Sequence, residues 1–499
     1  MFATVINTLN DWLYTYILII LLIAAGVYFT FRTRFVQFRM FAESIRVVGE
    51  KPHNAGSISS FQALMVSTAS RVGTGNIIGI STAVCCGGYG AVFWMWVIAL
   101  IGGASAFVES TLAQIYKRRD PHTGESYGGP SYYIEAALHS RTLAVVFAGA
   151  LILTYAGGFN MLAAYNLQST FSGYAFYNPD TTPWIIGAVL AAVVGYCVMG
   201  GGKRIIRFTS TLVPFMGGLY VLVAIVMVVL NWRMLPQVFG HIFAGAFDFQ
   251  AIFGGFTGSA MMYGIKRGLF SNEAGVGSAP NAAASADVSH PVKQGLVQML
   301  SVFIDTLLIC SATAFMLLCS GVAPEEALQG APYVQSALQA QFGAAGPIFI
   351  TVAMVLFAFT TLIGNLYYVD NCLNYIVGKI PAKEFMVLFR IDAMVLIFIG
   401  AGMEINMVWN LADVLMGVMA LINLPVIVLL FRPVRLALAD YAAQRHAGRN
   451  PEFQMADPRV PGTHVDDFRL AGPQLLHHRA HILLGHLDHQ QLHGLEQLA

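Results

Sequence analysis

The chain contains a series of apolar segments that are each long enough to cross a membrane, and this feature restricts its possible folds more than any other. Hydrophobic residues make up 57% of the sequence and charged residues 11%, whereas a soluble domain has about 25% charged residues. A transmembrane helix needs about 20 mainly apolar residues. We therefore expect an all-α membrane protein with eleven transmembrane helices. These lie at 12–31, 58–84, 88–117, 143–172, 183–200, 206–230, 248–268, 291–319, 346–378, 384–402 and 408–432.

Lysine and arginine residues fall in alternate loops between these spans, which predicts how the chain is oriented. Nearly all of the 27 lysines and arginines lie in loops on one side, including a loop with Lys266, Arg267 and Lys293. Arg233 lies on the other side, and Arg71 lies inside the second span. Because positively charged loops stay in the cytoplasm, the N-terminus is expected outside and the C-terminus in the cytoplasm.

The second span, 58–84, is interrupted by a glycine-rich stretch. Each glycine in a helix interior costs about 1 kcal/mol, so the helix is expected to break there. In lipid, an unwound backbone survives only where it is buried in protein or lines a cavity. A broken membrane helix is therefore the best indication in a sequence of a transporter's binding site. The stretch consists of Val72, Gly73, Thr74, Gly75 and Asn76.

A second glycine cluster lies in the span 248–268. Without the first span, the other ten divide into two groups of five, and each group then begins with an interrupted helix. Because five is odd, the two leading helices cross in opposite directions, which predicts an inverted repeat with substrate between the breaks. Glycines that only let helices pack closely are the alternative. The cluster consists of Gly254, Gly255, Phe256, Thr257 and Gly258.

This arrangement divides the chain into an N-terminal helix with a cytoplasmic loop, two five-helix repeats and a cytoplasmic tail. The tail is polar and rich in histidine after about residue 456, and we expect it to be disordered. Its alternative role is metal binding, because His477 and His481 would share one face of a helix. The four parts are residues 1–57, 58–230, 248–432 and 433–499.

The two breaks offer complementary groups to a zwitterion. A helix N-terminus carries about half a positive charge and free N–H groups, so the half-helix that begins near Asn76 can hold a carboxylate. Carbonyls of the second cluster can accept from an ammonium group, and Tyr155 or Phe159 can close over the site. The expected substrate is an amino acid with a small side chain. The expected substrate-binding residues are Gly73, Thr74, Gly75, Asn76, Gly254, Gly255, Phe256, Thr257, Phe159 and Asn365.

A pair of threonines inside the span 346–378 has two possible roles. The hydroxyls of Thr360 and Thr361 can bond back to carbonyls one turn earlier in their own helix. Alternatively, they can coordinate sodium, a hard cation that prefers oxygen ligands, together with carbonyls freed before the first break around Ala69 and Val72. The residues alone leave both roles open.

Longer motifs in the chain resemble those of one transporter family. Together they make the sequence, from about residue 10 to 455, similar to the alanine/glycine:cation (sodium) symporter family. The motifs are Arg71–Ile80 followed by Gly87–Trp96, then Glu125–Pro130, then Gly268–Pro280 followed by His290–Gly295.

This resemblance implies both a fold and a function. The implied fold is the leucine-transporter-like five-plus-five inverted repeat, preceded by one extra N-terminal helix, in the bacterial cytoplasmic (inner) membrane. The implied function is uptake of alanine or glycine coupled to sodium, which is the only metal ion expected and is transported rather than held as a cofactor. No nucleic-acid partner is expected. The implied cation ligands are the carbonyls of Ala69, Val72 and Phe357 and the hydroxyls of Thr360 and Thr361.

Arg71 keeps other transport mechanisms open. A charge at membrane depth costs between about 3 and more than about 10 kcal/mol unless it is paired or hydrated. Arg71 either faces a wet cavity, pairs with Glu109, Asp305 or Asp370, or replaces the transported cation. In the last case, transport is proton-coupled or the protein is an uncoupled facilitator. Glu273 is expected to cap a helix rather than to bind an ion.

A membrane-embedded enzyme is the third class of function to consider. Within the predicted spans, no grouping of His, Glu, Ser or Cys is typical of a catalytic or metal centre. The sequence therefore favours a transporter over an enzyme.

Overall fold

The computed structural model describes residues 2–52, 54, 57–119, 124–247, 259–378 and 381–453. This part of the chain is helical apart from its loops and one antiparallel hairpin, β1–β2. Seven of the described helices are long and apolar enough to cross a membrane, and each matches one of the predicted spans. They are Ala3–Arg32, Gly90–Ile115, Arg141–Ser169, Gly201–Leu230, Pro291–Leu318, Ala345–Val377 and Ile405–Leu429.

The four other predicted spans are not among these seven helices. The span 58–84 is divided into two helices, 183–200 forms the 17-residue helix α11, and 384–402 forms α21. The span 248–268 lies partly outside the described residues. The total of eleven transmembrane helices therefore stays a prediction.

The N-terminal residues form one long helix followed by two short ones. In the middle of the long helix, the segment η1 has π-helical geometry. The elements are α1 (Phe2–Trp12), η1 (Leu13–Leu18), α2 (Ile19–Arg32), α3 (Val36–Arg39) and α4 (Phe41–Val48).

The first group of long helices begins with a broken helix, α5 and α6, and has a short helix, α8, between its second and third long helices. A short helix, α13, follows the group. The elements are α5 (Ser60–Arg71), α6 (Gly75–Gly87), α7 (Gly90–Ile115), β1 (Arg118–Arg119), β2 (Ser126–Tyr127), α8 (Pro130–Leu138), α9 (Arg141–Ile152), η2 (Leu153–Gly158), α10 (Phe159–Ser169), α11 (Thr182–Val198), α12 (Gly201–Leu230), η3 (Trp232–Met234) and α13 (Leu235–Ala246).

The second group also begins with a broken helix, α15 and α16, and has a short helix, α19, between its second and third long helices. The elements are α15 (Ala260–Asn272), α16 (Pro280–Ser285), α17 (Pro291–Val302), η5 (Phe303–Cys310), α18 (Ser311–Leu318), η6 (Glu326–Leu328), α19 (Ala331–Phe342), α20 (Ala345–Val377), α21 (Lys383–Ala401), α22 (Ile405–Leu429) and α23 (Phe431–His446).

The boundaries of α5 follow from the chemistry of its end residues. The N–H of Gln62 donates to Ser59 Oγ (3.1 Å), and the N–H of Ser59 donates to Gln62 Oε1 (3.0 Å), which is a capping box. At the other end, Val72 leaves helical geometry with ψ of 86°, and α6 starts at Gly75. The helix break predicted between Val72 and Asn76 is therefore confirmed.

The second broken helix differs from the prediction. The cluster Gly254–Gly258 lies outside the described residues. Further along, α15 ends at Asn272, and Glu273, Gly275 and Gly277 take positive φ angles of 52°, 83° and 92° before α16 begins. Every residue from 273 to 279 is buried. A stretch expected in a cytoplasmic loop is therefore a helix break inside the protein.

Three basic residues assigned to that loop are also buried. Lys266 and Arg267 lie within α15, and each places a side-chain nitrogen 3.0 Å from Asp413 Oδ2 in α22. Lys293 lies within α17, and its Nζ is 2.7 Å from Glu50 Oε2. The loop assignment of all three was wrong, because buried ion pairs rather than solvent compensate their charges.

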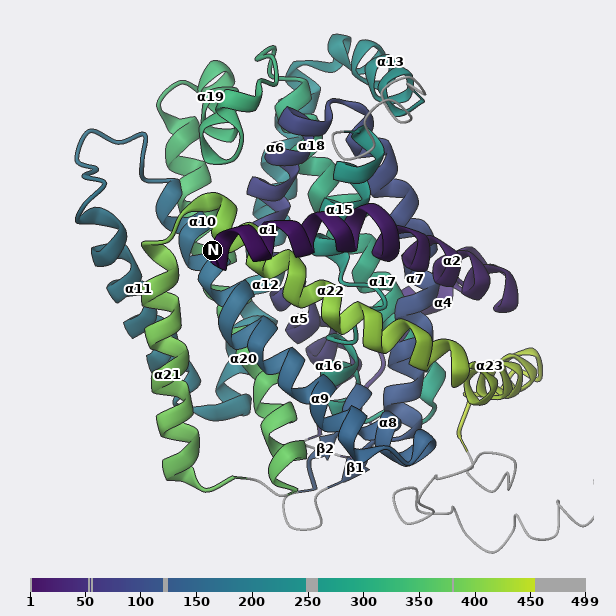
Figure 1. Ribbon diagram of the computed structural model, residues 1–499. Helices are drawn as coiled ribbons and strands as arrows, with labels where there is room; N and C mark the ends of the chain where they lie inside the picture. Colours follow the sequence, from purple (N-terminus) through teal and green to yellow (C-terminus); the bar gives the residue numbers. More distant parts are fainter. Residues whose placement is uncertain are drawn as a thin grey trace, which may run out of the picture. The chain divides into compact units, whose positions relative to one another are not determined.

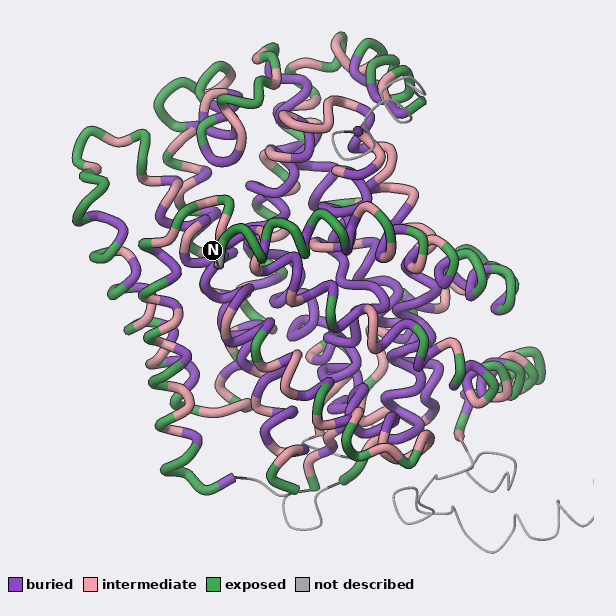
Figure 2. The backbone as a smooth tube through the Cα atoms, viewed as in Figure 1, coloured by how far each residue is buried: buried purple, intermediate pink, exposed green. Residues whose placement is uncertain are grey.

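The short helices mark the two ends of the bundle. Figure 1 shows α13 and α19 at the upper end and α8 with the β1–β2 hairpin at the lower end. Figure 2 shows that the buried residues concentrate between these ends, around α5, α6 and α15 to α17. The two helix breaks therefore lie in the interior of the bundle.

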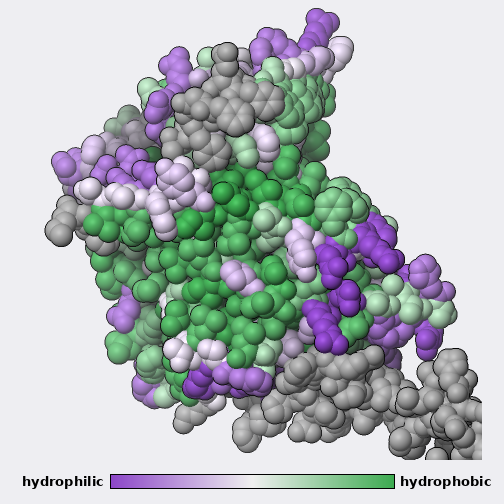
Figure 3. Space-filling model, turned by 45° about the vertical axis from the view of Figure 1, so that its right-hand side comes forward, coloured by the Kyte–Doolittle hydropathy of each residue, from purple (hydrophilic) through white to green (hydrophobic). Residues whose placement is uncertain are grey.

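The outer surface of the bundle is apolar between its two ends. Large hydrophobic side chains are exposed there, for example Ile185 of α11, Leu222 of α12 and Leu388 of α21. Figure 3 shows a broad hydrophobic zone with hydrophilic residues above and below it. An apolar surface of this extent is not tolerated in water, and it fits the lipid-facing surface of a membrane protein.

Candidate functional site

The first helix break is held open by two asparagines. Asn76 Oδ1 accepts the backbone N–H of Gly73 (2.8 Å), and Asn166 Nδ2 of α10 donates to Thr74 Oγ1 (3.1 Å). All four residues are buried. The start of α6 is thus fixed with its N-terminal N–H groups at the break, where a helix favours an anion.

A chain of hydrogen bonds joins the end of α5 to α20 and α10. Ser70 Oγ donates to Asn365 Oδ1 (2.6 Å), and Asn365 Nδ2 donates to Asn160 Oδ1 (2.9 Å). A Cβ added at Gly364 would lie 2.8 Å from the Ser70 nitrogen, so only glycine lets α20 approach α5 this closely. The structure therefore brings the predicted residue Asn365 against the break.

The two threonines of α20 have different environments. Thr360 Oγ1 donates to the carbonyls of Leu356 (2.9 Å) and Phe357 (3.1 Å) in its own helix. Thr361 Oγ1 is buried and has no hydrogen-bond partner among the described residues. A Cβ at Gly73 would collide with this hydroxyl. The hydroxyl of Thr361 therefore lies directly against the break, as a cation ligand there requires.

An aromatic cluster covers the first break. The ring centroids of Phe159 and Phe270 are 4.9 Å apart, those of Phe270 and Trp409 are 5.0 Å apart, and those of Tyr155 and Phe159 are 4.9 Å apart. A Cβ at Gly75 would lie 2.5 Å from Phe270 Cε1. Sequence analysis identified Tyr155 and Phe159 but missed Phe270 and Trp409, because an aromatic residue in an apolar helix carries no distinguishing local signal.

Polar side chains from other helices hold the second break. Glu109 Oε1 of α7 accepts the N–H of Gly275 (3.2 Å), and Asn423 Nδ2 of α22 donates to the carbonyl of Gly275 (2.9 Å) and to Glu109 Oε2 (2.9 Å). Glu273 is the C-cap residue of α15, and its carboxylate accepts from Ser278 Oγ (2.6 Å). Glu273 therefore ends α15 through its backbone conformation, and its carboxylate binds Ser278 instead of capping a helix N-terminus.

Arg71 is 3% exposed and lies at the end of α5, beside the first break. Its Nη1 donates to the carbonyl of Gln298 (3.5 Å), while Nε and Nη2 have no partner within the described part of the chain. The three acids expected as its partners bind other groups. Asp370 forms an ion pair with Arg390 at 2.7 Å, and Glu109 accepts the backbone N–H of Gly275. Asp305 accepts hydrogen bonds from the side chains of Asn76 and Thr306. Within the described residues, Arg71 therefore forms no ion pair with any of these three acids, although its positive charge interacts with Glu109 and Asp305 over a longer distance.

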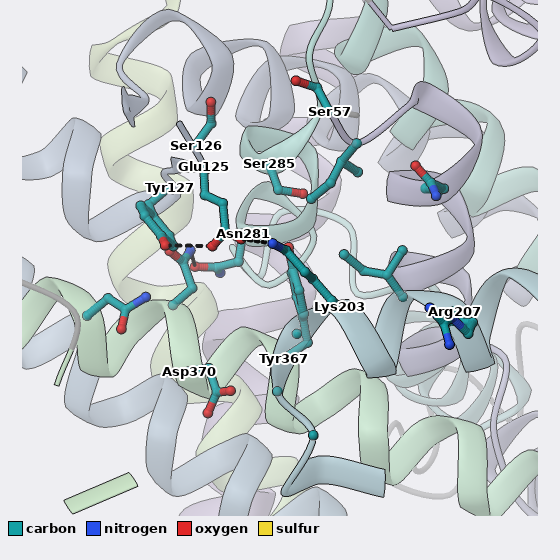
Figure 4. Close-up of a pocket in the computed structure, with 18 of the residues that line it drawn as sticks. Ser57, Glu125, Ser126, Tyr127, Lys203, Arg207, Asn281, Ser285, Tyr367 and Asp370 are labelled. Carbon is teal, nitrogen blue, oxygen red and sulfur yellow. Dashed lines mark hydrogen bonds and ion pairs between the residues drawn. The ribbon is translucent and has the colours of Figure 1, made fainter. Parts of the chain in front are cut away.

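A cavity of about 1190 Å³ lies at the end of the bundle that carries the hairpin. It is lined by residues of α5, β2, α12, α16, α20 and α21, with several charged side chains, including Lys203 beside Glu125 (3.5 Å). Figure 4 shows Glu125, Tyr127 and Asn281 on one side of this cavity and Tyr367 and Asp370 on another. We call this cavity the vestibule.

The vestibule reaches a cluster of hydrogen bonds next to the second break. Asn371 Nδ2 of α20 donates to Asn281 Oδ1 of α16 (2.7 Å) and to the carbonyl of Gly128. Asn281 Nδ2 donates to the carbonyl of Ser278 (2.9 Å). A polar contact between α16 and α20 thus forms part of the wall of the vestibule next to the second break.

Two discontinuous helices whose breaks meet among buried polar residues, inside a bundle with an apolar outer surface, define a membrane transporter. The chain belongs to the sodium:alanine symporter family, because the model of that family matches residues 1–455. The protein is thus an integral membrane protein and a cation-coupled amino-acid symporter, and its family is one of transporters rather than enzymes.

Individual relatives agree with the family assignment. The chain is 43% identical to the amino-acid carrier protein AlsT of Bacillus subtilis, over 92% of this chain and 96% of that protein. It is 43% identical to a probable sodium/glutamine symporter, GlnT, of the same organism, over 90% and 92%. It is 37% identical to the sodium/alanine symporter AgcS of Methanococcus maripaludis, over 85% and 93%.

A solved structure shares the fold. The crystal structure of MhsT in complex with L-phenylalanine matches with a TM-score of 0.52 and 18% sequence identity, covering 75% of this chain and 89% of that one. At this level of identity, the likeness shows the fold alone.

Proposed function

We propose that the protein couples inward movement of sodium to uptake of a small neutral amino acid, alanine or glycine, across the cytoplasmic membrane. The observation that carries this proposal is the buried hydroxyl of Thr361, which has no hydrogen-bond partner in the described chain and faces Gly73. A buried oxygen atom is expected to have a partner, and a bound cation would supply one for this hydroxyl. The proposed cation ligands are this hydroxyl, that of Thr360, and the carbonyls of Ala69, Val72 and Phe357.

The substrate is assigned to the start of α6. Its carboxylate would lie at the N–H group of Gly75, because a helix N-terminus favours an anion and the N–H of Asn76 already donates to the carbonyl of Gly73. Phe159, Phe270 and Trp409 limit the room beside these residues, so a small side chain fits best. The part of the predicted site that the structure describes also includes Gly73, Thr74 and Asn365. Its other members, Gly254, Gly255, Phe256 and Thr257, lie outside the described residues and stay predictions.

We also propose the five-plus-five inverted repeat. The two breaks have the same pattern of residues: a charged residue, a small apolar residue, glycine, any residue, glycine and a polar residue. The short helices α8 and α19 occupy the same place in the order of their groups and lie at opposite ends of the bundle (Figure 1). Inverted repeats produce this arrangement. The matching stretches are Arg71–Asn76 and Glu273–Ser278.

The vestibule then serves as the path from the site to the cytoplasm. It opens where lysines and arginines gather, including Lys203, Arg207 and Lys383, and such residues favour the cytoplasmic side. The structure would accordingly represent a state open to the inside, with the contact between Asn281 and Asn371 in the wall of this path.

Cysteine labelling tests the orientation and the vestibule together. In a cysteine-free background, Asp180→Cys, in the loop before α11, is expected to react with an impermeant maleimide added outside intact cells. Lys203→Cys and Ser210→Cys, which line the vestibule, are expected to react only in inside-out vesicles. The opposite pattern would place the N-terminus inside and would make the vestibule an external entrance.

The alternative is a proton-coupled or uncoupled facilitator, and the specific observation in its favour is Arg71. A permanent guanidinium buried beside the break can replace a transported cation. The two mechanisms differ in what drives transport, because a facilitator moves substrate only down the gradient of the substrate itself.

Uptake into proteoliposomes tests the proposal. Labelled alanine is expected to accumulate above its external concentration when an inward sodium gradient is imposed, and only to equilibrate when choline replaces sodium. Accumulation driven by an inward proton gradient without sodium would contradict sodium coupling. Equilibration under every gradient would identify a facilitator.

A further inference from the structure

Five exposed arginines lie where the C-terminal helix α23 meets α2 and the short helix α3 that follows α2. None of them forms an ion pair with another described residue, whereas Arg46 and Arg445 in the same region both pair with Glu43. Residues 19–42 and 414–439 contain no aspartate or glutamate. We call this surface the basic face, and it consists of Arg32, Arg34, Arg39, Arg432 and Arg435.

Aromatic rings join the end of α2 to the start of α23 and support one of these arginines. The ring centroids of Tyr28 and Phe431 are 5.8 Å apart. The guanidinium carbon of Arg32 lies 5.9 Å from the centroid of the Tyr28 ring and 6.0 Å from that of Phe431, so cation–π attraction holds the guanidinium in place. Arg432 follows Phe431 directly, and Arg435 lies one turn later on α23. The three arginines therefore extend from adjoining positions.

The turn between α2 and α3 fixes another part of the basic face. Arg34 and Phe35 take positive φ angles of 56° and 55°, which residues other than glycine rarely adopt. The N–H of Phe35 donates to the carbonyl of Thr30 (2.8 Å), and Gln37 Nε2 donates to Thr30 Oγ1 (2.9 Å). Backbone strain of this kind persists where surrounding contacts enforce it and is frequent where ligands are held. Here it exposes a cationic and an aromatic side chain next to each other.

Exposed apolar side chains border the basic face. Figure 1 shows α2, α4 and α23 on the same side of the bundle, and Figure 3, which turns this side forward, shows hydrophilic residues directly beside the hydrophobic zone. Arginines next to exposed aromatic and aliphatic side chains are typical of a surface at the membrane interface. The bordering side chains are Phe31, Phe35, Phe38, Phe41, Ile45 and Leu429.

We propose that the basic face binds an anionic phospholipid, with the lipid phosphate at Arg32, Arg432 and Arg435 and the acyl chains along the bordering apolar side chains. A guanidinium offers a planar pair of N–H donors that matches the oxygens of a phosphate. Basic clusters beside a membrane span attract anionic headgroups. The apolar border favours a lipid over a free phosphate, because it provides a surface for the chains. This inference goes beyond the proposed transport function and does not depend on the transported substrate or ion.

A lipid at this place would complete the attachment of α23 to the bundle. Near the other end of α23, Glu43 of α4 accepts from Tyr441 Oη (2.6 Å) and pairs with Arg445 (3.1 Å). At the start of α23, the described contacts to α2 are aromatic and include no ion pair. The phosphate of the lipid would supply to the start of the helix the electrostatic link that Glu43 supplies to its end.

Lipid titration of the purified protein in a neutral detergent tests the proposal. Phosphatidylglycerol is expected to raise the melting temperature, because a ligand of the folded state stabilises it, and phosphatidylcholine is expected to raise it less. In Arg32→Gln/Arg432→Gln, the phosphatidylglycerol concentration for half of the maximal rise is expected to increase at least about tenfold, since two charges that attract the headgroup are lost. Both arginines are exposed and unpaired, so the melting temperature without lipid is expected to stay the same.

Arg233→Gln/Arg449→Gln is the matched control, because it removes two exposed arginines that lie outside the basic face. Arg233 also lies over an aromatic ring, that of Trp232, at 5.8 Å. The control is expected to respond to phosphatidylglycerol as the wild type does. An equal loss of response in the control would show that only net charge matters and would overturn the site.

A second pair of variants covers the case in which the double variant is unstable without lipid. Arg32→Lys keeps the charge and loses the planar donors, and Arg435→Gln removes one charge. Each of these single changes is expected to raise the required phosphatidylglycerol concentration severalfold. A response to phosphatidylglycerol that neither change alters would overturn the proposal.

The choice of added molecule separates a lipid site from simpler surfaces. Inorganic phosphate is expected to leave the melting temperature unchanged, and an equal rise with phosphate would identify a plain anion site. An equal rise with phosphatidylcholine would identify an apolar surface without a headgroup site. Either result would overturn the inference, as would an unchanged phosphatidylglycerol response in Arg32→Gln/Arg432→Gln. All of these outcomes leave the proposed sodium-coupled uptake untouched, because no measurement among them involves transport.

Discussion

Gly75→Leu is expected to abolish amino-acid uptake and to leave the protein in the membrane. Gly75 is the first residue of α6 and is buried, at the place proposed for the substrate carboxylate. A leucine there would fill that space. Its Cβ would also lie 2.5 Å from Phe270 Cε1, so the aromatic ring has to move. Since Phe270 contacts Phe159 and Trp409, the whole aromatic cluster over the break would be displaced.

The measurement is uptake of labelled alanine, together with the amount of protein in the membrane fraction. Gly218→Leu is the matched control: Gly218 is an exposed glycine within α12, and nothing lies within 4 Å of a Cβ added there. The control is expected to transport normally. Normal uptake by Gly75→Leu as well would show that Gly75 serves helix packing and lies outside the path of the substrate.

The first helix break was predictable because its cause is local. Gly73 and Gly75 weaken the helix wherever it lies, and Asn76 then accepts the N–H of Gly73 only three positions away. The sequence over these few residues contains both the reason for unwinding and the group that compensates it.

The second break was misplaced because its cause is not local. The stretch after Asn272 contains fewer adjacent glycines than the cluster Gly254–Gly258, so the cluster gives the stronger local signal. The partners of Gly275 are Glu109 and Asn423, which lie 166 and 148 positions away in the chain. Only tertiary contacts of this kind make an unwound backbone stable inside a bundle.

The loop assignment of Lys266 and Arg267 was wrong for a related reason. Lys266 and Arg267 were assigned to a cytoplasmic loop because a basic pair rarely lies inside a membrane. Their partner, Asp413, belongs to α22. It lies 146 positions after Arg267 in the chain, so the residues around Lys266 and Arg267 do not indicate this ion pair. The sequence does identify Asp305 as an acid within a span, but it does not show the ring of neutral donors around it.

For the threonine pair, sequence analysis left two roles open, and the structure places the two hydroxyls in different environments. Thr360 makes the bond back to its own helix, whereas Thr361, one position later on the helix, faces Gly73 and has no partner among the described residues. One position turns a helical side chain by about 100°, which is enough to change the environment of the hydroxyl completely.

Thr361→Val is consequently expected to raise the sodium concentration for half-maximal uptake by at least about tenfold, the usual effect of losing a metal-site group. The substitution exchanges a hydroxyl for a methyl group at nearly constant shape. Because Thr361 Oγ1 has no hydrogen-bond partner in the described chain, removing it breaks no hydrogen bond there, and the stability without sodium is expected to stay the same or to rise. A loss of sodium affinity would therefore report the ion itself.

Thr360→Val is the matched comparison on the same helix turn. Its hydroxyl donates to the carbonyls of Leu356 and Phe357 and is thus bonded to its own helix, whereas that of Thr361 faces Gly73, so loss of the Thr360 hydroxyl is expected to shift the sodium curve less than Thr361→Val does. The measurement is initial uptake of labelled alanine against sodium at fixed pH and constant ionic strength. Coinciding curves for wild type and Thr361→Val would exclude this hydroxyl from the cation site. A larger shift for Thr360→Val would reverse the roles of the two residues, and a wild-type curve without any dependence on sodium would remove the ion from the mechanism and leave Arg71 as the resident cation.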